Sequence, residues 1–173
     1  MRSLSPRALF FGLAVVSAMA VTPAMAQTVS STFQVTMTIQ KACTVTAGAP
    51  SNIALGTVAS TATNVAGNNT ITVNCSKTTP YFIGLAPSNA NTAGLGAMSG
   101  TGANPDKVGY QLRSTAGTSG TIWGNTATST AVGNGVAGTG TGANQTQTVY
   151  VTVPSANFTP DTYTDVVTVN VNY

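Results

Sequence analysis

The chain has 173 residues, of which 42% are hydrophobic and only 5% are charged. A typical soluble domain carries about 25% charged residues, so Ser, Thr, Asn, Gln and Gly must cover most of this surface. The net charge is +3, but two of the six basic residues lie within the first ten positions. The remaining four basic residues are nearly balanced in charge by three acidic residues. They leave no basic patch, so we expect no nucleic-acid partner.

The first 26 residues have the pattern of a secretory signal. Two arginines precede an apolar run over 8–21 that is too short for a confident membrane span, and an Ala-x-Ala cleavage motif follows at 24–26. We expect cleavage between Ala26 and Gln27, with no membrane span in the chain that remains. An uncleaved anchor is the alternative.

Two cysteines follow the signal, Cys43 and Cys75. In an exported protein an even number of cysteines predicts a disulfide, which on the chain-entropy model stabilises the fold by about 3–4 kcal/mol. The alternative is a metal pair. Because the chain has no His and no third soft ligand, we expect no metal site.

Alternation of apolar and polar residues predicts strands along the whole chain after the signal. The strong period-two patterns cover 33–39, 71–75, 81–85, 149–153 and 163–173, and shorter candidates lie at 43–46, 53–58, 108–112 and 121–123. Pro154 is expected to end the fourth strong pattern. Stretches rich in Gly, Ala, Asn and Thr at 88–104 and 116–148 are expected to be loops. Seven to nine short strands without a helical stripe predict an all-β sandwich.

The sequence offers little for catalysis, since it has no His, the commonest general base. Asp106, Asp161 and Asp165 form no obvious pair, and they are too few and scattered for calcium. We therefore expect no catalytic residue, no cofactor and no enzyme activity. Asp165 has the parity of an inward face and is expected to cap loop N–H groups. Trp123 is expected in the core, with a sugar-binding platform as the alternative.

Several motifs occur in a fixed order. They are the alternating strand 33–39, Cys43, Leu55-Gly56, Cys75, Tyr110-Gln111-Leu112, Trp123-Gly124, the glycine-rich stretch 138–142, and Tyr163-Thr164-Asp165 running to Tyr173. This order resembles the spore coat protein U domain family, which includes the major pilins of archaic chaperone–usher pili. The sequence departs from the family pattern at Asp161, where a Gly commonly stands, and at Leu55, where an aromatic residue often stands.

The resemblance implies an incomplete immunoglobulin-like β-sandwich whose groove is filled first by a periplasmic chaperone and then by the N-terminal strand of the next subunit. The donor residues would be Phe33, Val35, Met37 and Ile39, and the acceptor groove would be lined partly by Val167, Val169 and Val171. Two features of the sequence favour donation. The alternating strand that ends at Tyr173 has nothing after it to pair along it, and the three residues 40–42 span only about 10 Å. The alternative is that 33–39 is the first strand of a complete domain.

We thus expect a signal peptide at 1–26, a donor strand with a short linker at 27–42 and a pilin sandwich at 43–173. The resemblance implies a subunit of a bacterial surface fibre for adhesion and biofilm formation, exported through the periplasm. Its partners would be copies of itself, related pilins, the chaperone and an outer-membrane usher. A secreted coat or matrix protein that does not polymerise, and a carbohydrate-binding tip adhesin on the same scaffold, are the alternatives.

Overall fold

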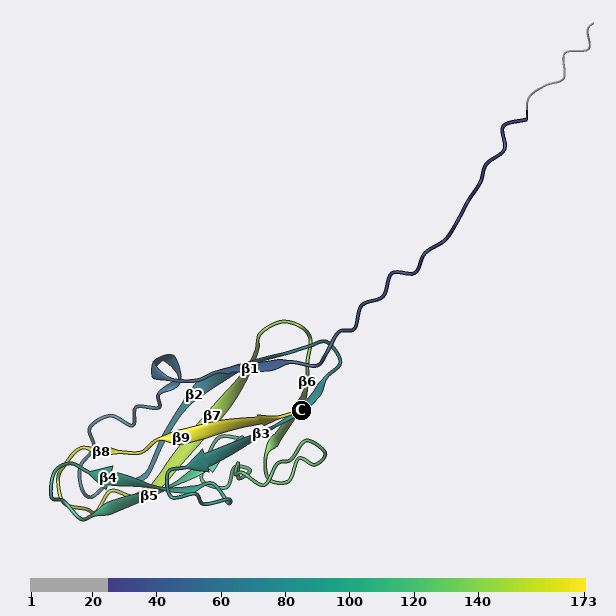
Figure 1. Ribbon diagram of the computed structural model, residues 1–173. Coiled ribbons are helices and arrows are strands. Elements are labelled where there is room, and N and C mark those ends of the chain that lie inside the picture. The colour runs from purple at the N-terminus through teal and green to yellow at the C-terminus, as the bar shows by residue number, and fades with distance from the viewer. Residues whose placement is uncertain (1–24) are drawn as a thin grey trace, which may run out of the picture. The chain divides into compact units, whose positions relative to one another are not determined.

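The computed structural model describes residues 25–173, so the predicted signal peptide lies outside it except for its last two residues. Cleavage after Ala26 stays a prediction. The chain divides into one unit that ends at Met37 and a second unit of Thr38–Tyr173, which contains all the strands (Figure 1). In the described part of the chain, no helix has the length and apolar character needed to cross a membrane.

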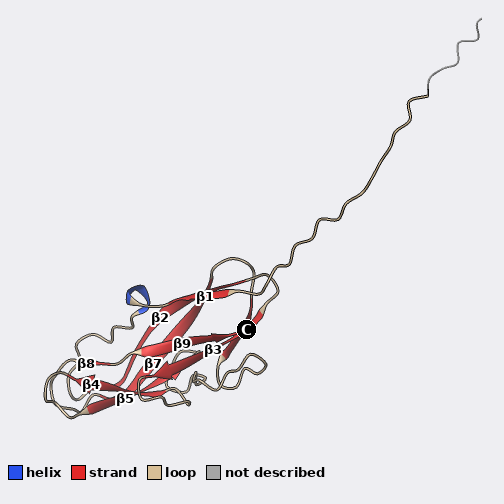
Figure 2. Ribbon diagram, viewed as in Figure 1, coloured by secondary structure: helices blue, strands red, loops and turns tan. Residues whose placement is uncertain are grey.

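The second unit consists of two antiparallel sheets and one short 3-10 helix (Figure 2). The elements are β1 (Cys43–Thr46), η1 (Ala49–Ser51), β2 (Thr63–Cys75), β3 (Pro80–Pro87), β4 (Leu95–Gly100), β5 (Lys107–Arg113), β6 (Val136–Thr139), β7 (Gln145–Ser155), β8 (Tyr163–Thr164) and β9 (Val167–Asn172). One sheet has the order β1-β2-β7-β5-β4-β8 and the other the order β6-β3-β9. The predicted all-β sandwich is confirmed.

The core lies between the two sheets and uses the apolar faces that the alternation predicted. The alternating residues of β2, β3, β5 and β7 are buried together with one indole, and they comprise Ile71, Val73, Cys75, Tyr81, Ile83, Leu85, Val108, Tyr110, Leu112, Trp123, Val149, Val151 and Val153. Trp123 is 1% exposed, and its Nε1 donates a hydrogen bond of 2.8 Å to the carbonyl of Ile83. This burial confirms the core position of Trp123 and removes it as a sugar-binding platform.

Two strands form where loops were expected, and a glycine explains each of them. Gly96 of β4 pairs with Tyr110, and Gly138 of β6 pairs with Tyr81. A Cβ at either glycine would overlap the partner ring. Glycine therefore suits these strands because it gives an aromatic ring the space to lie across its backbone, a cross-strand relation that the composition of each stretch does not reveal.

Other expected strands are shorter, longer or absent. Residues 33–39 and 53–58 form no strand in the described structure, and 121–123 contributes only an isolated bridge between Ile122 and Arg113. Pro154 does not end β7, because the ladder pairs Val153 and Ser155 with β2 and skips the proline between them. The missing N–H of Pro154 therefore costs no ladder hydrogen bond.

The C-terminal pattern from 163 to 173 is two strands rather than one. β8 pairs with β4 in the larger sheet, whereas β9 pairs with β3 in the smaller one. Asp165 and Val166 carry the chain from one sheet to the other. The side chains on either side of this crossing keep the predicted parity, but they belong to opposite layers of the sandwich.

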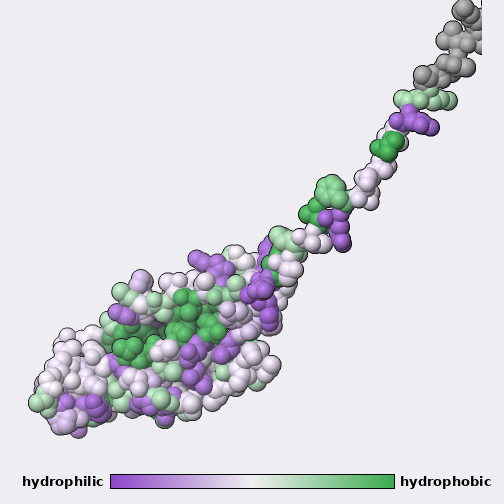
Figure 3. Space-filling model, in the orientation of Figure 1, coloured by the Kyte–Doolittle hydropathy of each residue, from purple (hydrophilic) through white to green (hydrophobic). Residues whose placement is uncertain are grey.

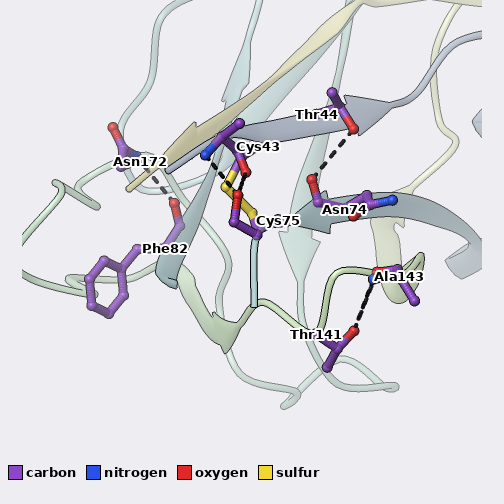
Figure 4. The surroundings of a disulfide bond; sticks show 10 residues. Cys43, Thr44, Asn74, Cys75, Phe82, Thr141, Ala143 and Asn172 are labelled. Carbon is purple, nitrogen blue, oxygen red and sulfur yellow. Dashed lines mark hydrogen bonds between the residues drawn. A yellow bond between two sulfur atoms is a disulfide. The ribbon is translucent and has the colours of Figure 1, made fainter. Parts of the chain in front are cut away.

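The predicted disulfide is present and joins directly opposed residues of β1 and β2 (Figure 4). Cys75 is fully buried. The residues just before and after the bridge also bond to each other, since the Ala42 N–H donates to Ser76 Oγ at 3.0 Å and the Ser76 N–H donates to the Ala42 carbonyl at 2.9 Å. The chain is therefore fixed to the sandwich from residue 42 onward.

Asp161 holds the turn between β4 and β5 against the segment before β8. Its carboxylate accepts hydrogen bonds from the Thr101 N–H at 2.8 Å, from the Thr101 hydroxyl and from Asn104 Nδ2 at 2.8 Å. These bonds to Thr101 and Asn104, together with the Thr162 N–H, lower the pKa of Asp161 to about 2. Thr159 lowers the pKa of Asp106 nearby by donating its N–H at 3.0 Å.

Replacing both cysteines with alanine (Cys43→Ala/Cys75→Ala) should lower the free energy of unfolding by about 2–4 kcal/mol, because the bridge closes a loop between residues 32 positions apart. Urea unfolding of the oxidised wild type, the reduced wild type and the double variant measures the difference. The reduced wild type should match the double variant. A double variant as stable as the oxidised wild type would contradict the expectation.

Asp161→Asn should flatten the acid limb of the stability profile. Because the folded pKa of Asp161 lies below its ordinary value of 3.8, this carboxylate contributes stability above about pH 4 that is lost as the pH falls toward 2. Urea midpoints measured from pH 7 to pH 2 should therefore fall less steeply in Asp161→Asn than in the wild type. Asp106→Asn, which removes fewer hydrogen bonds, should have the smaller effect, and identical profiles for all three proteins would refute this role.

Candidate functional site

An open apolar cleft of about 700 Å³ lies between the two sheets along one side of the sandwich. Its floor is made of core side chains from four strands, namely Ile71, Leu85, Leu112, Val149 and Val151. In Figure 3 the apolar side chains gather on this face, between β1 with the segment that follows it and β9. Core side chains therefore form the bottom of the cleft, although each of them is at most 7% exposed.

β9 forms one wall of the cleft. It is the outer strand of its sheet and pairs only with β3, so the backbone groups along its other edge have no strand partner among the described residues. Val167 and Val169 line the cleft. Val171, which was grouped with them from the sequence, is not part of the lining; it lies opposite Ile83 in the ladder and packs against the core.

The segment from 52 to 56 forms the facing wall. Ile53 and Leu55 are half-buried and alternate with exposed neighbours, as in a strand, although the segment pairs with no strand in the described structure. They lie over Gly67 of β2, where an added Cβ would come within 2.9 Å of Leu55 and 3.0 Å of Ile53. Asn69 fixes the start of the segment by donating to the carbonyls of Pro50 at 3.0 Å and Asn52 at 2.7 Å.

One end of the cleft is polar. Tyr110 and Asp165 both line it, and the Tyr110 hydroxyl donates to Asp165 Oδ2 at 2.7 Å. Burial raises the pKa of the Tyr110 hydroxyl far above its usual range, and the bond to Asp165 raises this pKa further, so the hydroxyl remains a donor. Asp165 also accepts from the Val166 N–H at 2.8 Å. The expected capping of loop N–H groups is thus limited to one neighbouring amide, and the main partner is the Tyr110 phenol of β5.

The N-terminal arm, residues 27–39, has the apolar pattern of a strand without the structure of one. Phe33, Val35, Met37 and Ile39 are between 78% and 88% exposed, and residues 25–42 have no regular secondary structure. Four large apolar side chains at every second position are unusual on an exposed surface, and exposed apolar patches of this kind mark interaction sites. Their role as donors stays a prediction.

Sequence reasoning missed most of the cleft. The alternation in β9 pointed to Val167 and Val169, and a similar alternation at Ile53 and Leu55 was available but was read as an ordinary strand. Met98, Tyr110 and Tyr163 also line the cleft. They come from β4, β5 and β8, and no pattern within a single strand shows that these three strands meet at one end of it.

Among the described residues no group of three or more His, Cys, Asp or Glu side chains could hold a metal ion. The acidic residues instead serve as hydrogen-bond acceptors for named structural partners, as Asp161 does for Thr101 and Asp165 does for Tyr110. The chemistry that the cleft offers is therefore apolar contact and backbone hydrogen bonding.

Comparisons with known proteins identify a family and a solved structure that the chain resembles. The model of the Spore Coat Protein U domain matches residues 29–170. A solved structure that resembles the chain is the CsuC–CsuE chaperone–tip adhesion subunit pre-assembly complex from the archaic chaperone–usher Csu pili of Acinetobacter baumannii, at 20% identity and a TM-score of 0.45. The likeness covers 79% of this chain and 40% of that one. No curated protein matches in sequence. Since the family model spans most of its length, the chain belongs to the spore coat protein U domain family.

Proposed function

We propose that this chain is a structural subunit of a bacterial surface fibre, and that the fibre grows when the N-terminal arm of one copy enters the cleft of another. The observation that carries the proposal is the open apolar cleft beside the unpaired edge of β9. An added strand would find backbone partners along that edge and apolar side chains beneath it, which is recognition by β-strand addition.

The arm has the chemistry that this cleft needs. Its apolar residues stand at every second position from 33 to 39, so in an extended conformation all four side chains point to one side. Burying a large apolar side chain is worth about 1.5–3 kcal/mol, and four of them would outweigh the cost of ordering a short strand. The residues between them are Gln and Thr, which suit the outer face.

The linker favours a second copy as the acceptor. Ala42 is fixed to Ser76 by three hydrogen bonds, and only Gln40, Lys41 and Ala42 separate Ile39 from the start of β1. Three extended residues span about 10 Å, which is short for a reversal into the cleft of the same molecule.

In this proposal the chain is exported through the periplasm, where a chaperone covers the cleft until an outer-membrane usher brings two subunits together. An uncovered apolar cleft with a free strand edge is an aggregation hazard, and a chaperone that supplies a temporary strand would remove it. The finished fibre would support adhesion and biofilm formation. A tip adhesin has less support, since Trp123, the best aromatic platform in the sequence, is buried.

The direct test is an unheated, detergent-treated gel of the cell-surface fraction beside a boiled sample. A ladder at multiples of the mature subunit that collapses on boiling is expected, because strand-exchanged contacts resist detergent until the domain unfolds. A single monomer band in both lanes, from protein shown to be folded and oxidised, would instead support the secreted matrix protein.

Val35→Asp should abolish the ladder, because a carboxylate in the apolar cleft costs several kcal/mol. Thr36→Asp is the matched control: it adds the same charge to the neighbouring residue, which would face outward, and it should leave the ladder intact. Circular dichroism of both variants checks that the sandwich is folded. A normal ladder from Val35→Asp would rule out the arm as the donor.

A further inference from the structure

Two lysines lie at one end of the domain and the three aspartates lie at the other, where Lys107 also lies and donates to Ser99 Oγ at 2.7 Å. Lys41 and Lys77 lie at the end where the disulfide joins β1 to β2, which we call the lysine end. Both are exposed, and they stand next to Ala42 and Ser76, which are hydrogen-bonded to each other. Lys41 is the only charged residue between the predicted cleavage site and Ser76.

All three acidic residues lie at the opposite end, which we call the aspartate end. Asp161 binds the β4–β5 turn, Asp106 binds Thr159, and Asp165 follows β8. β3 runs from the lysine end toward this end, and its last residue, Pro87, pairs with Val167. β3 has eight residues, and at about 3.3 Å each they place Asp165 roughly 25 Å from the lysine end. In Figure 1, β4 and β8 lie at one end of the domain and the start of β1 at the other.

The direction of an arm in the cleft determines at which end of the acceptor the donor domain lies. If the arm ran parallel to β9, the body of its own copy would arrive at the lysine end of the acceptor, from which the acceptor's own linker leaves. Both neighbours would then crowd one end. If the arm ran antiparallel to β9, the neighbours would occupy opposite ends, which gives a head-to-tail chain that extends without closing. Charge favours the same choice, because the parallel arrangement would place lysines against lysines.

If all four apolar arm residues occupy the cleft in the antiparallel arrangement, Ile39 is the last of them and lies at the polar end. Lys41 follows two residues later, so it emerges at the mouth of the cleft, beside Asp165. The one charged residue of the linker would then meet the one carboxylate that lines the cleft.

We propose that Lys41 of the donor copy pairs with Asp165 of the copy that receives its arm, and that this contact fixes how far the arm slides into the cleft. The proposal rests on the proposed function. An alternating strand offers little discrimination between registers two residues apart, because each shift keeps the same face inward. A charged residue at the end of the strand supplies the discrimination, since a slip in either direction separates Lys41 from Asp165.

The test is the dissociation of purified fibres at a fixed elevated temperature, followed by light scattering at low and at high salt. Lys41→Gln fibres should dissociate about two- to fivefold faster than wild-type fibres at low salt, and the difference should vanish at high salt, as for a solvent-accessible ion pair. Lys41→Arg should restore the wild-type rate. Lys77→Gln, at the same end but outside the linker, should dissociate at the wild-type rate.

Asp165→Asn completes the cycle, because its amide oxygen can still accept from the Tyr110 hydroxyl, although the Val166 N–H then loses its acceptor. It should dissociate as fast as Lys41→Gln, and the double variant should be no faster than either single variant. Equal rates for the wild type and Lys41→Gln at low salt, or additive effects in the double variant, would refute the pairing of Lys41 with Asp165. Neither result would contradict the polymerisation of the subunit into a fibre. Absence of any polymer from the wild type would refute the proposed function instead.

Discussion

A sandwich buries its core only where each sheet covers the inner face of the other, and here the two sheets are unequal. Six strands face three, and the outer strand of the smaller sheet, β9, has no strand partner on its free side among the described residues. The core residues Ile71 and Val149 therefore lie at the bottom of an open cleft. The apolar cleft and its walls are both understandable from this one inequality.

The sequence predicted the parts of the fold that are governed by period-two burial. The inward faces of β2, β3 and β7 were correct because valine and isoleucine at alternate positions leave few other choices, and the disulfide followed from an even cysteine count in a chain predicted to be exported. β4 and β6 were missed because Gly96 and Gly138 read as loop residues until the rings of Tyr110 and Tyr81 are seen across them.

The site was only partly predictable for a related reason. Val167 and Val169 share one strand and one face, so their common position could be read from spacing alone. The pairing of Tyr110 with Asp165 joins β5 to the crossing segment after β8, positions 55 residues apart, and no local pattern encodes it. The break at Asp165 and Val166 was hidden as well, because the parity of the side chains continues through the crossing from one sheet to the other.

The place of the disulfide has a mechanical consequence. A pulling force applied through the linker would enter the domain at Cys43, the first residue of a four-residue strand. The backbone bonds of so short a strand would be peeled away one at a time under such a load. The bridge instead transfers the tension at once to Cys75, at the end of the thirteen-residue β2, whose ladder with β7 extends along the middle of the larger sheet. The tensile strength of the domain would thus be set by its longest strand pair rather than by its weakest edge.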